Sequence, residues 1–265
     1  MSEPEDGAEY LGREVKFARE ARGWSQAVLA TKLHCGQSYV SKIESGSQLA
    51  SPQFAEQCDV VFGTPGVYAR LRERAAQGGH PSWFAPFTKL ERDAVAMRVF
   101  ESQIIPGLLQ TEAYARAMLE SVRPDRLEDL VAARMSRQRV LQGEERPHCW
   151  FILDEQVLWR PIGGATVWRA QLERLLTEGQ NPRTVIQVVP RAVPAHPGLS
   201  GAFTLLTPAA GPIALYAEGF PEGRTTEEAA QVAAAERAYA LLTSVALSHE
   251  ASAELIAMHM KELGP

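Results

Sequence analysis

The chain has 265 residues, of which 45% are hydrophobic and 22% charged, and this composition predicts a globular protein of about two domains. Its first residues are acidic, and no apolar run reaches the roughly 18 residues of a membrane span, so we expect neither a secretory signal nor a membrane segment and place the protein in the cytoplasm. Cys35, Cys58 and Cys149 form no CxxC pair, which predicts reduced, mostly buried thiols, no metal site and no cofactor.

The formal net charge of -5 is spread unevenly along the chain. Residues 1–9 carry four acids and no base, and we expect them to form a solvated acidic leader, with folding over a basic face as the alternative. Residues 10–76 carry nine basic and six acidic side chains, a net +3, whereas residues 77–265 carry 18 and 22, a net -4. Because electrostatic attraction is local, residues 10–76 are the candidate for a nucleic-acid contact.

Residues 10–76 have the pattern of five short helices, with apolar side chains at every third or fourth position. Ser25 is placed to cap the second helix, and the third is expected from Gln37 to Glu44. Ser51-Pro52 and Thr64-Pro65 are placed to begin the fourth and fifth. The side chains expected to be buried are Leu11, Val15, Ala18, Leu29, Leu33, Val40 and Ile43.

Gly78, Gly79 and Pro81 interrupt the helical pattern and predict a linker at residues 77–83. Helical and strand periods then mix irregularly, which predicts an α+β domain over residues 84–265. Strands are expected near residues 95–99, 149–155, 184–190, 201–207 and 212–218, and helices near 111–121, 127–141, 165–176 and 226–260, the last with a break near Ser248.

The run LGREVKFAREARGWSQAVLATKLHCGQSYVSKIESG resembles the five-helix helix-turn-helix domain of the phage repressor and Cro family of XRE-type regulators, over about residues 10–74. The matching features are the Ser-Gln pair at the second helix, the small Ala30 at a helix crossing, and VSKIESG. The resemblance implies DNA-binding roles, with Gln26 bonded to phosphate and with base edges or flanking phosphates contacted by Gln37, Ser38, Ser41 and Lys42. It also implies that Arg19 and Glu44 form a partly buried ion pair with a structural role.

Tyr39 is left with two alternatives, a phosphate contact or packing beside the turn. The chain departs from the family pattern at Val28, His34 and Gly36, where Glu, Gly and Ser or Thr are common, and these departures weaken helix caps rather than the fold. Lys42 is the one cation of the third helix, so specificity is expected to depend on Gln37 and on DNA shape. A bundle that binds only proteins is the other interpretation; the polar face, the local positive charge and the register favour DNA.

The larger domain has no strong catalytic motif. The run PGLSGA at residues 197–202 lacks the second flanking glycine of a nucleophile elbow, and the histidines lie far apart in sequence. Glu155 follows an apolar strand and either lies at a pocket mouth or simply ends the strand. We therefore predict that the protein is not an enzyme.

The runs QIIPGLLQTEAYARAML, FILDEQVLWRPIGG and TVIQVVPRAVPAHPGLSGAFTLL resemble the C-terminal domain of an antitoxin-like, DUF5753-type regulator family abundant in actinomycetes, over about residues 84–258. The resemblance implies a small protein partner encoded nearby, and no catalytic residue can be transferred from it. Residues 105–110, the best match, are expected to form a strand-to-helix corner that packs the core, with a ligand site as the less favoured alternative, followed by Thr111 as a helix cap.

These patterns together predict a multidomain chain, an all-α five-helix helix-turn-helix domain followed by an α+β regulatory domain. We expect a nucleoid-associated repressor that binds a double-stranded DNA operator as a homodimer, because a module of charge +3 neutralises few phosphates by itself. The signal is expected to be the small protein partner. A small-molecule sensor is the main alternative, and an enzyme tethered to DNA is the third.

Overall fold

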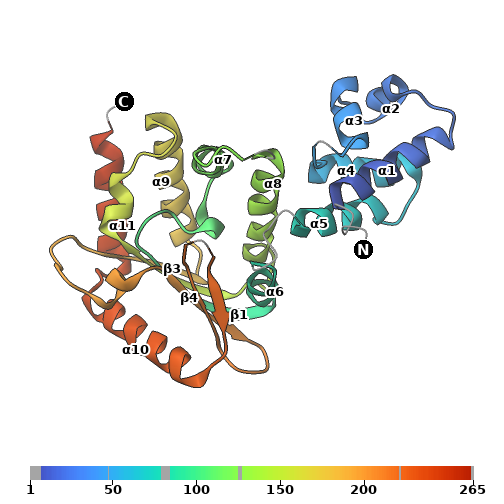
Figure 1. The fold of residues 1–265 in the computed structure, drawn as a ribbon. Helices are drawn as coiled ribbons and strands as arrows, with labels where there is room; N and C mark the ends of the chain where they lie inside the picture. The colour runs from blue at the N-terminus through green and yellow to red at the C-terminus, as the bar shows by residue number, and fades with distance from the viewer. Residues whose placement is uncertain (1–6, 47, 79–83, 125–126, 221, 264–265) are drawn as a thin grey trace. The chain divides into compact units, whose positions relative to one another are not determined.

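The computed structural model describes residues 7–46, 48–78, 84–124, 127–220 and 222–263. The chain forms two compact units, the first from residues 1–82 and 122–136 and the second from residues 83–121 and 137–265 (Figure 1). The predicted fold class is confirmed: a five-helix region comes first and is followed by an α+β domain with one mixed sheet. Residues 79–83 of the predicted linker lie outside the described residues, and the exact domain limits stay a prediction.

The first unit contains the five expected helices. They are α1 (Gly7–Glu20), α2 (Gln26–Lys32), α3 (Gln37–Glu44), α4 (Pro52–Phe62) and α5 (Val67–Gly78). The seven side chains that the sequence pattern predicted to be inside are all buried. Helix α1 begins at Gly7, so the end of the expected acidic leader is helical and residues 1–6 of it lie outside the described part.

Helix α5 starts later than its Thr64-Pro65 signal predicted. Gly66 has a φ of +74°, which a right-handed helix does not allow, so residues 64–66 form a turn. The carboxylate of Asp59 then caps the helix by accepting hydrogen bonds from the backbone N–H groups of Tyr68 (3.0 Å) and Ala69 (2.9 Å) and from the Thr64 hydroxyl (2.5 Å). Burial raises the pKa of Asp59, but these hydrogen bonds outweigh it and hold the pKa below its ordinary value.

Most of helix α8 (Leu127–Arg137) belongs to the first unit, although its sequence lies within the second predicted domain. Asp129 is buried and accepts a hydrogen bond of 2.7 Å from the backbone N–H of Leu49, in the loop that follows α3. Ala132 packs against the core of the five helices. The compact unit is therefore not one continuous stretch of chain.

The second unit is built on a six-stranded sheet in the order β3-β2-β1-β4-β5-β6. The strands are β1 (Ala94–Glu101), β2 (His148–Asp154), β3 (Thr184–Val189), β4 (Phe203–Pro208), β5 (Ala214–Ala217) and β6 (Arg224–Thr226). Strands β1, β2 and β3 are parallel, and β4, β5 and β6 continue the sheet in antiparallel fashion. The sequence pattern predicted the first five strands; β6, with three residues, was not predicted.

Helices cover both faces of this sheet (Figure 1). One face packs against α6 (Ala85–Asp93), α7 (Glu112–Glu120), α9 (Ala165–Gly179) and α11 (His249–Glu262). The other packs against α10 (Ala229–Val245). Ser248 caps α11, as the predicted break in the last helix requires, whereas α6 was not predicted.

Residues 105–110 form the expected corner between β1 and α7. Ile105 and Leu109 are fully buried, and the side chain of Gln110 donates a hydrogen bond of 2.7 Å to the carbonyl of Ile105. The hydroxyl of Thr111 accepts from the Tyr114 N–H and caps α7. The motif thus closes a turn of the core, as predicted.

Residues 190–202, the β3–β4 connection, cross the carboxyl ends of the parallel strands, because β3 is at the sheet edge and β4 lies beyond β1. Gly198 lies on the ring of Phe100, and a Cβ atom at this position would meet that ring at 2.1 Å. The run PGLSGA is therefore part of a close-packed crossing loop, and the contact with Phe100 explains why glycine stands at position 198.

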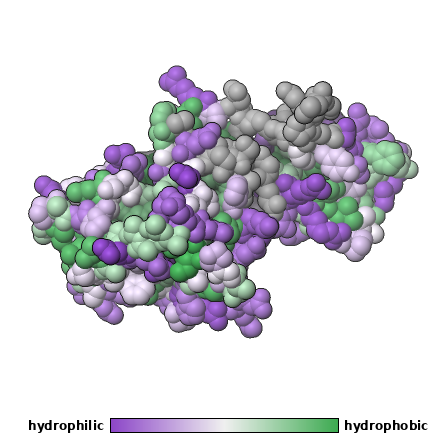
Figure 2. Space-filling view, turned by 60° about the horizontal axis from the view of Figure 1, so that its bottom comes forward, coloured by the Kyte–Doolittle hydropathy of each residue, from purple (hydrophilic) through white to green (hydrophobic). Residues whose placement is uncertain are grey.

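On the surface drawn in Figure 2, hydrophobic residues occur in small groups among hydrophilic ones.

Candidate nucleic-acid interface

A tight turn joins α2 to α3. Ser25 caps α2 by accepting a hydrogen bond from the Val28 N–H at 3.2 Å. His34 has a φ of +51°, the left-handed conformation that glycine adopts most easily, and Gly36 caps α3 without a side-chain hydrogen bond. The departures from the family pattern at His34 and Gly36 therefore leave the turn intact.

Helix α3 separates a buried side from a solvent side. Val40 and Ile43 are 0% and 1% exposed and hold the helix against α1 and α2. The opposite side, which we call the outward face of α3, consists of exposed Gln37, Ser38, Ser41 and Lys42. Positions i, i+1, i+4 and i+5 share one side of a helix, so one surface presents all four side chains.

Beneath the outward face, Arg19 of α1 and Glu44 of α3 form the expected ion pair. Two parallel hydrogen bonds join the guanidinium to the carboxylate, at 2.5 and 2.9 Å, and the Arg19 and Glu44 side chains are only 9% and 3% exposed. The hydrogen bond to Glu44 raises the pKa of Arg19 above its ordinary value, in spite of burial. The third guanidinium nitrogen, Nη1, donates a hydrogen bond of 2.8 Å to the carbonyl of Trp24 and so ties the pair to the segment before α2.

Gln26 also contacts this ion pair. Its amide nitrogen donates a hydrogen bond of 3.0 Å to Oε2 of Glu44. An amide group carries two N–H donors, so one can hold Gln26 against Glu44 while the other points to a phosphate. Glu44 thus holds the Gln26 side chain in place, and its phosphate role stays a prediction.

Tyr39 packs beside the turn, which was one of the two roles expected for it. Its ring meets Phe54 edge to face, with centroids 5.4 Å apart, and its hydroxyl oxygen accepts a hydrogen bond of 2.9 Å from the Ser51 N–H. These contacts tie α3 to the start of α4. The hydroxyl hydrogen stays able to donate, so a phosphate contact is still compatible with this position.

Two further side chains support this surface and were not found from the sequence. Asp129 lies 80 residues from its partner Leu49, and no local pattern marks so distant a contact. Asp59 lies within α4 and caps the following helix across a turn, so no rule for a helix start marks it, and Thr64-Pro65 was the stronger local signal.

A family comparison defines both parts of the chain. Residues 10–71 match a model described as a helix-turn-helix domain, and residues 84–258 match a domain of unknown function, DUF5753. The fold and the exposed α3 surface thus define a helix-turn-helix protein with an appended α+β domain. The chain belongs to the DUF5753 family, whose model covers most of its length.

A curated relative gives a narrower likeness. The competence pilus inhibition repressor of Acinetobacter baylyi is 41% identical over 52 residues, which are 20% of this chain and 47% of the relative, so the match spans about half of that protein. The helix-turn-helix domain and this likeness support a DNA-binding transcriptional regulator. No solved structure matches the chain. Among the described residues, no helix is long and apolar enough to cross a membrane.

Proposed function

We propose that this protein is a sequence-specific DNA-binding transcriptional regulator that acts as a dimeric repressor controlled through its α+β domain. The observation that carries the proposal is the outward face of α3, four exposed polar side chains on a helix whose other side is anchored by Val40, Ile43 and the buried Arg19–Glu44 pair. An exposed polar face on a rigidly held second helix is what major-groove recognition requires.

In this proposal α3 enters the major groove. Gln37, at the first turn of the helix, bonds a base edge, since an amide pairs in bidentate fashion with adenine. Ser38 and Ser41 bond base edges or phosphates, and Lys42 neutralises a phosphate. Because most of the polar groups are uncharged, base contacts and DNA shape account for more of the discrimination than charge does.

We infer dimerisation from the charge of the helical region. A segment of net charge +3 displaces few counterions, so one copy binds weakly at physiological salt. Two copies bound to half-sites about one helical turn of DNA apart would add their contacts, and the dimer would then bind its operator with useful affinity. Size-exclusion chromatography with light scattering tests this step, and a monomer that binds a single half-site tightly would contradict it.

Control is proposed to come from a small protein that binds the α+β domain. Helix α8 supports a route for the signal, because its Asp129 holds the N–H of Leu49 five residues after α3 ends. A partner that displaced this helix would free the loop behind the outward face. Co-purification with the product of the neighbouring small gene tests the proposal: a complex with altered operator affinity supports it, and independence of the two proteins contradicts it.

The DNA-binding proposal is tested first by sequencing the DNA that the protein retains in cells. The fragment recovered then serves in mobility-shift assays with Gln37→Ala and Lys42→Ala. We expect each variant to bind more weakly, and Lys42→Ala to lower the slope of log affinity against log salt by up to about one unit. If operator binding survives both changes unaltered, the assignment of α3 to recognition is wrong.

A further inference from the structure

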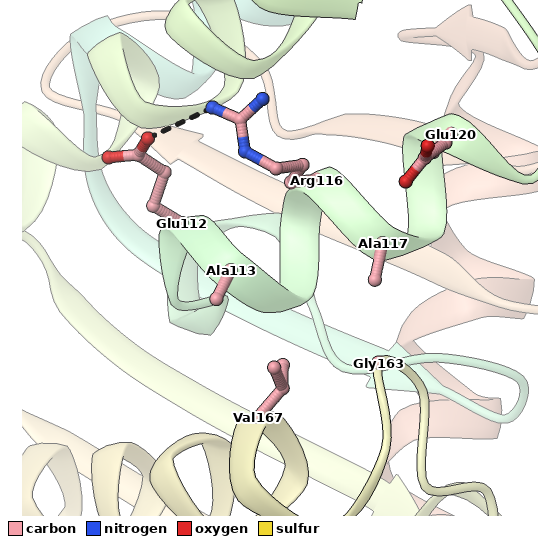
Figure 3. A pocket seen from close by; sticks show the side chains of 7 residues that line it. All are labelled: Glu112, Ala113, Arg116, Ala117, Glu120, Gly163 and Val167. Carbon is pink, nitrogen blue, oxygen red and sulfur yellow. Dashed lines mark hydrogen bonds and ion pairs between the residues drawn. The ribbon is translucent and has the colours of Figure 1, made fainter.

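Two pockets of similar size open on the α+β domain. One, of about 410 Å³, lies between α7 and the residues that begin α9 (Figure 3). The small side chains of Ala113, Ala117 and Val167 lie along it, and Glu112 is paired with Arg116 at 3.2 Å within the same helix. The polar groups of this pocket, exposed Glu112 and Glu120 and partly buried Arg116, all belong to one surface of α7 and do not converge on a ligand.

The second pocket, of about 380 Å³, lies at the carboxyl ends of the parallel strands. Its walls are Asp154 at the end of β2, the short 3-10 helix η4 (Glu155–Trp159), and residues 190–199 of the connection that follows β3. In open sheets, ligands bind outside the carboxyl ends of parallel strands, where the chain crosses to another part of the sheet. The volume is within the range of small-molecule sites.

His196 lines this pocket and is almost completely buried, with its side chain 3% exposed. Its Nε2 lies 3.0 Å from Oδ2 of Asp154, whose other oxygen accepts the Gln156 N–H at 2.8 Å. In the tautomer with its hydrogen on Nε2, the ring donates this bond to the carboxylate, and Nδ1 is then an acceptor. The other ring nitrogen, Nδ1, is buried and has no hydrogen-bond partner among the described residues. A buried polar atom without a partner is costly, and this one belongs to a residue that lines the pocket.

Apolar and cationic groups stand on the other side of the opening. Trp159 is 55% exposed and Leu199 63% exposed, and both line the opening. The guanidinium of Arg191 lies 5.6 Å from the centre of the Trp159 ring. Arg191 makes no ion pair in the part of the chain that is described, while the charge of Asp154 is taken up by two hydrogen bonds.

A second layer of contacts fixes this rim. Oε2 of Glu155 accepts the backbone N–H of Arg191 at 2.6 Å, and Oε1 lies 3.6 Å from Nε2 of His259. The His259 ring meets the Trp159 ring edge to face, with centroids 5.1 Å apart. The buried Glu155 thus follows the end of β2, holds the backbone of Arg191 and contacts the His259 ring that meets Trp159. Its side chain is not one of those that line the pocket, so the alternative of a pocket mouth stays a prediction.

We propose that this pocket binds a small organic anion with a planar apolar body: the aromatic part lies along Trp159 and Leu199, the anionic group meets Arg191, and a polar hydrogen-bonding group meets Nδ1 of His196. The pocket would then be the point at which a small-molecule signal enters the α+β domain. The inference does not depend on DNA binding by α3, so the two can fail separately.

The test uses the fluorescent aromatic anion 1-anilinonaphthalene-8-sulfonate with the full chain. Three proteins are titrated: the wild type, Arg191→Gln, and Arg224→Gln as the matched control, since Arg224 is exposed on β6 at the opposite edge of the sheet. We expect saturable binding by the wild type and the control and about tenfold weaker binding by Arg191→Gln, the loss of one charge-assisted contact. Benzoate should displace the probe more effectively than the uncharged benzamide.

A His196→Leu variant tests the inner end of the pocket, with its melting temperature measured in parallel. Weaker probe binding at an unchanged melting temperature supports the proposal. If Arg191→Gln and Arg224→Gln bind the probe equally, or if the wild type does not bind it saturably, the proposal is overturned. An operator-binding assay with the same variants then shows separately whether α3 still recognises DNA.

Discussion

The outward face of α3 and the pocket of the α+β domain are built in opposite ways. The first takes its polar side chains from six consecutive positions, Gln37 to Lys42, because one helix turn brings them to one side. The second joins residues 154–159 to residues 190–199, which meet only because parallel strands end at the same edge. The residues of a surface on one helix are thus close together in the sequence, whereas the residues of a pocket at strand ends come together only when the sheet forms.

The two regions also differ in what holds them. A buried ion pair and a distant carboxylate fix the loop and helix around α3, whereas close contact between a glycine and an aromatic ring fixes the connection above the pocket. A substitution that destabilises one region should therefore leave the other region folded.

The largest effect is expected from Glu44→Ala. The variant leaves the buried guanidinium of Arg19 without its carboxylate, and breaking a buried pair from one side costs about 3–5 kcal/mol. Hydrogen exchange should show lost protection in α1 to α5 and unchanged protection in the sheet. The double variant Arg19→Met/Glu44→Leu should recover much of the stability, and a single variant that loses less than about 1 kcal/mol would contradict a buried pair.

A smaller loss, about 1–3 kcal/mol, is expected from Asp129→Ala, which leaves the Leu49 N–H without its acceptor. Asp129→Asn is the matched control, because its amide oxygen can still accept that hydrogen bond. Urea unfolding compares the two free energies of unfolding. Equal losses in both variants would show that the hydrogen bond to Leu49 is not what Asp129 contributes.

On the other side of the comparison, Gly198→Ala is expected to destabilise the α+β domain by about 1–3 kcal/mol, because the new Cβ would overlap the Phe100 ring. Leu199→Ala, at the exposed next position, is expected to change stability by less than about 0.5 kcal/mol. Operator binding by both variants should stay near that of the wild type. A Gly198→Ala protein as stable as the wild type would refute the close contact.

The smallest effect is expected in the pH dependence of the free energy of unfolding. Because the folded-state pKa of Asp59 is depressed below its ordinary value of 3.8, its contribution to stability is present above that value and is lost as the pH falls through the folded pKa. The free energy of unfolding of the helical unit should therefore fall more steeply below about pH 4 in the wild type than in Asp59→Asn. Parallel pH profiles for the two proteins would show that Asp59 is not the titrating group.

The sequence predicted most of the helical unit because its information is local. Ser25 and Ser51-Pro52 mark helix starts, and apolar spacing located Val40 and Ile43 correctly. The start of α5 was missed, because its true cap, Asp59, acts across a glycine turn that the Thr64-Pro65 signal obscured.

In the α+β domain, the sequence predicted the strands but not their order or the long-range contacts. Strand patterns located β1 to β5, but strand order is set by long-range pairing, and the crossing of residues 190–202 follows from that order. His196 was assigned no role from sequence, since its partner Asp154 lies 42 residues away. Asp129 was missed for the same reason, since its partner Leu49 lies 80 residues away in the sequence.

The central claim, that the outward face of α3 recognises DNA while the rest of the unit supports it, is tested most directly by the operator affinity of Gln37→Ala. The matched control is Gln180→Ala, the same change at an exposed position at the end of α9. Mobility-shift titration should show a loss of about fivefold to a hundredfold for Gln37→Ala, the worth of about 1–3 kcal/mol for one base contact, and no loss for the control. Equal affinity of the two variants for the operator would contradict the claim.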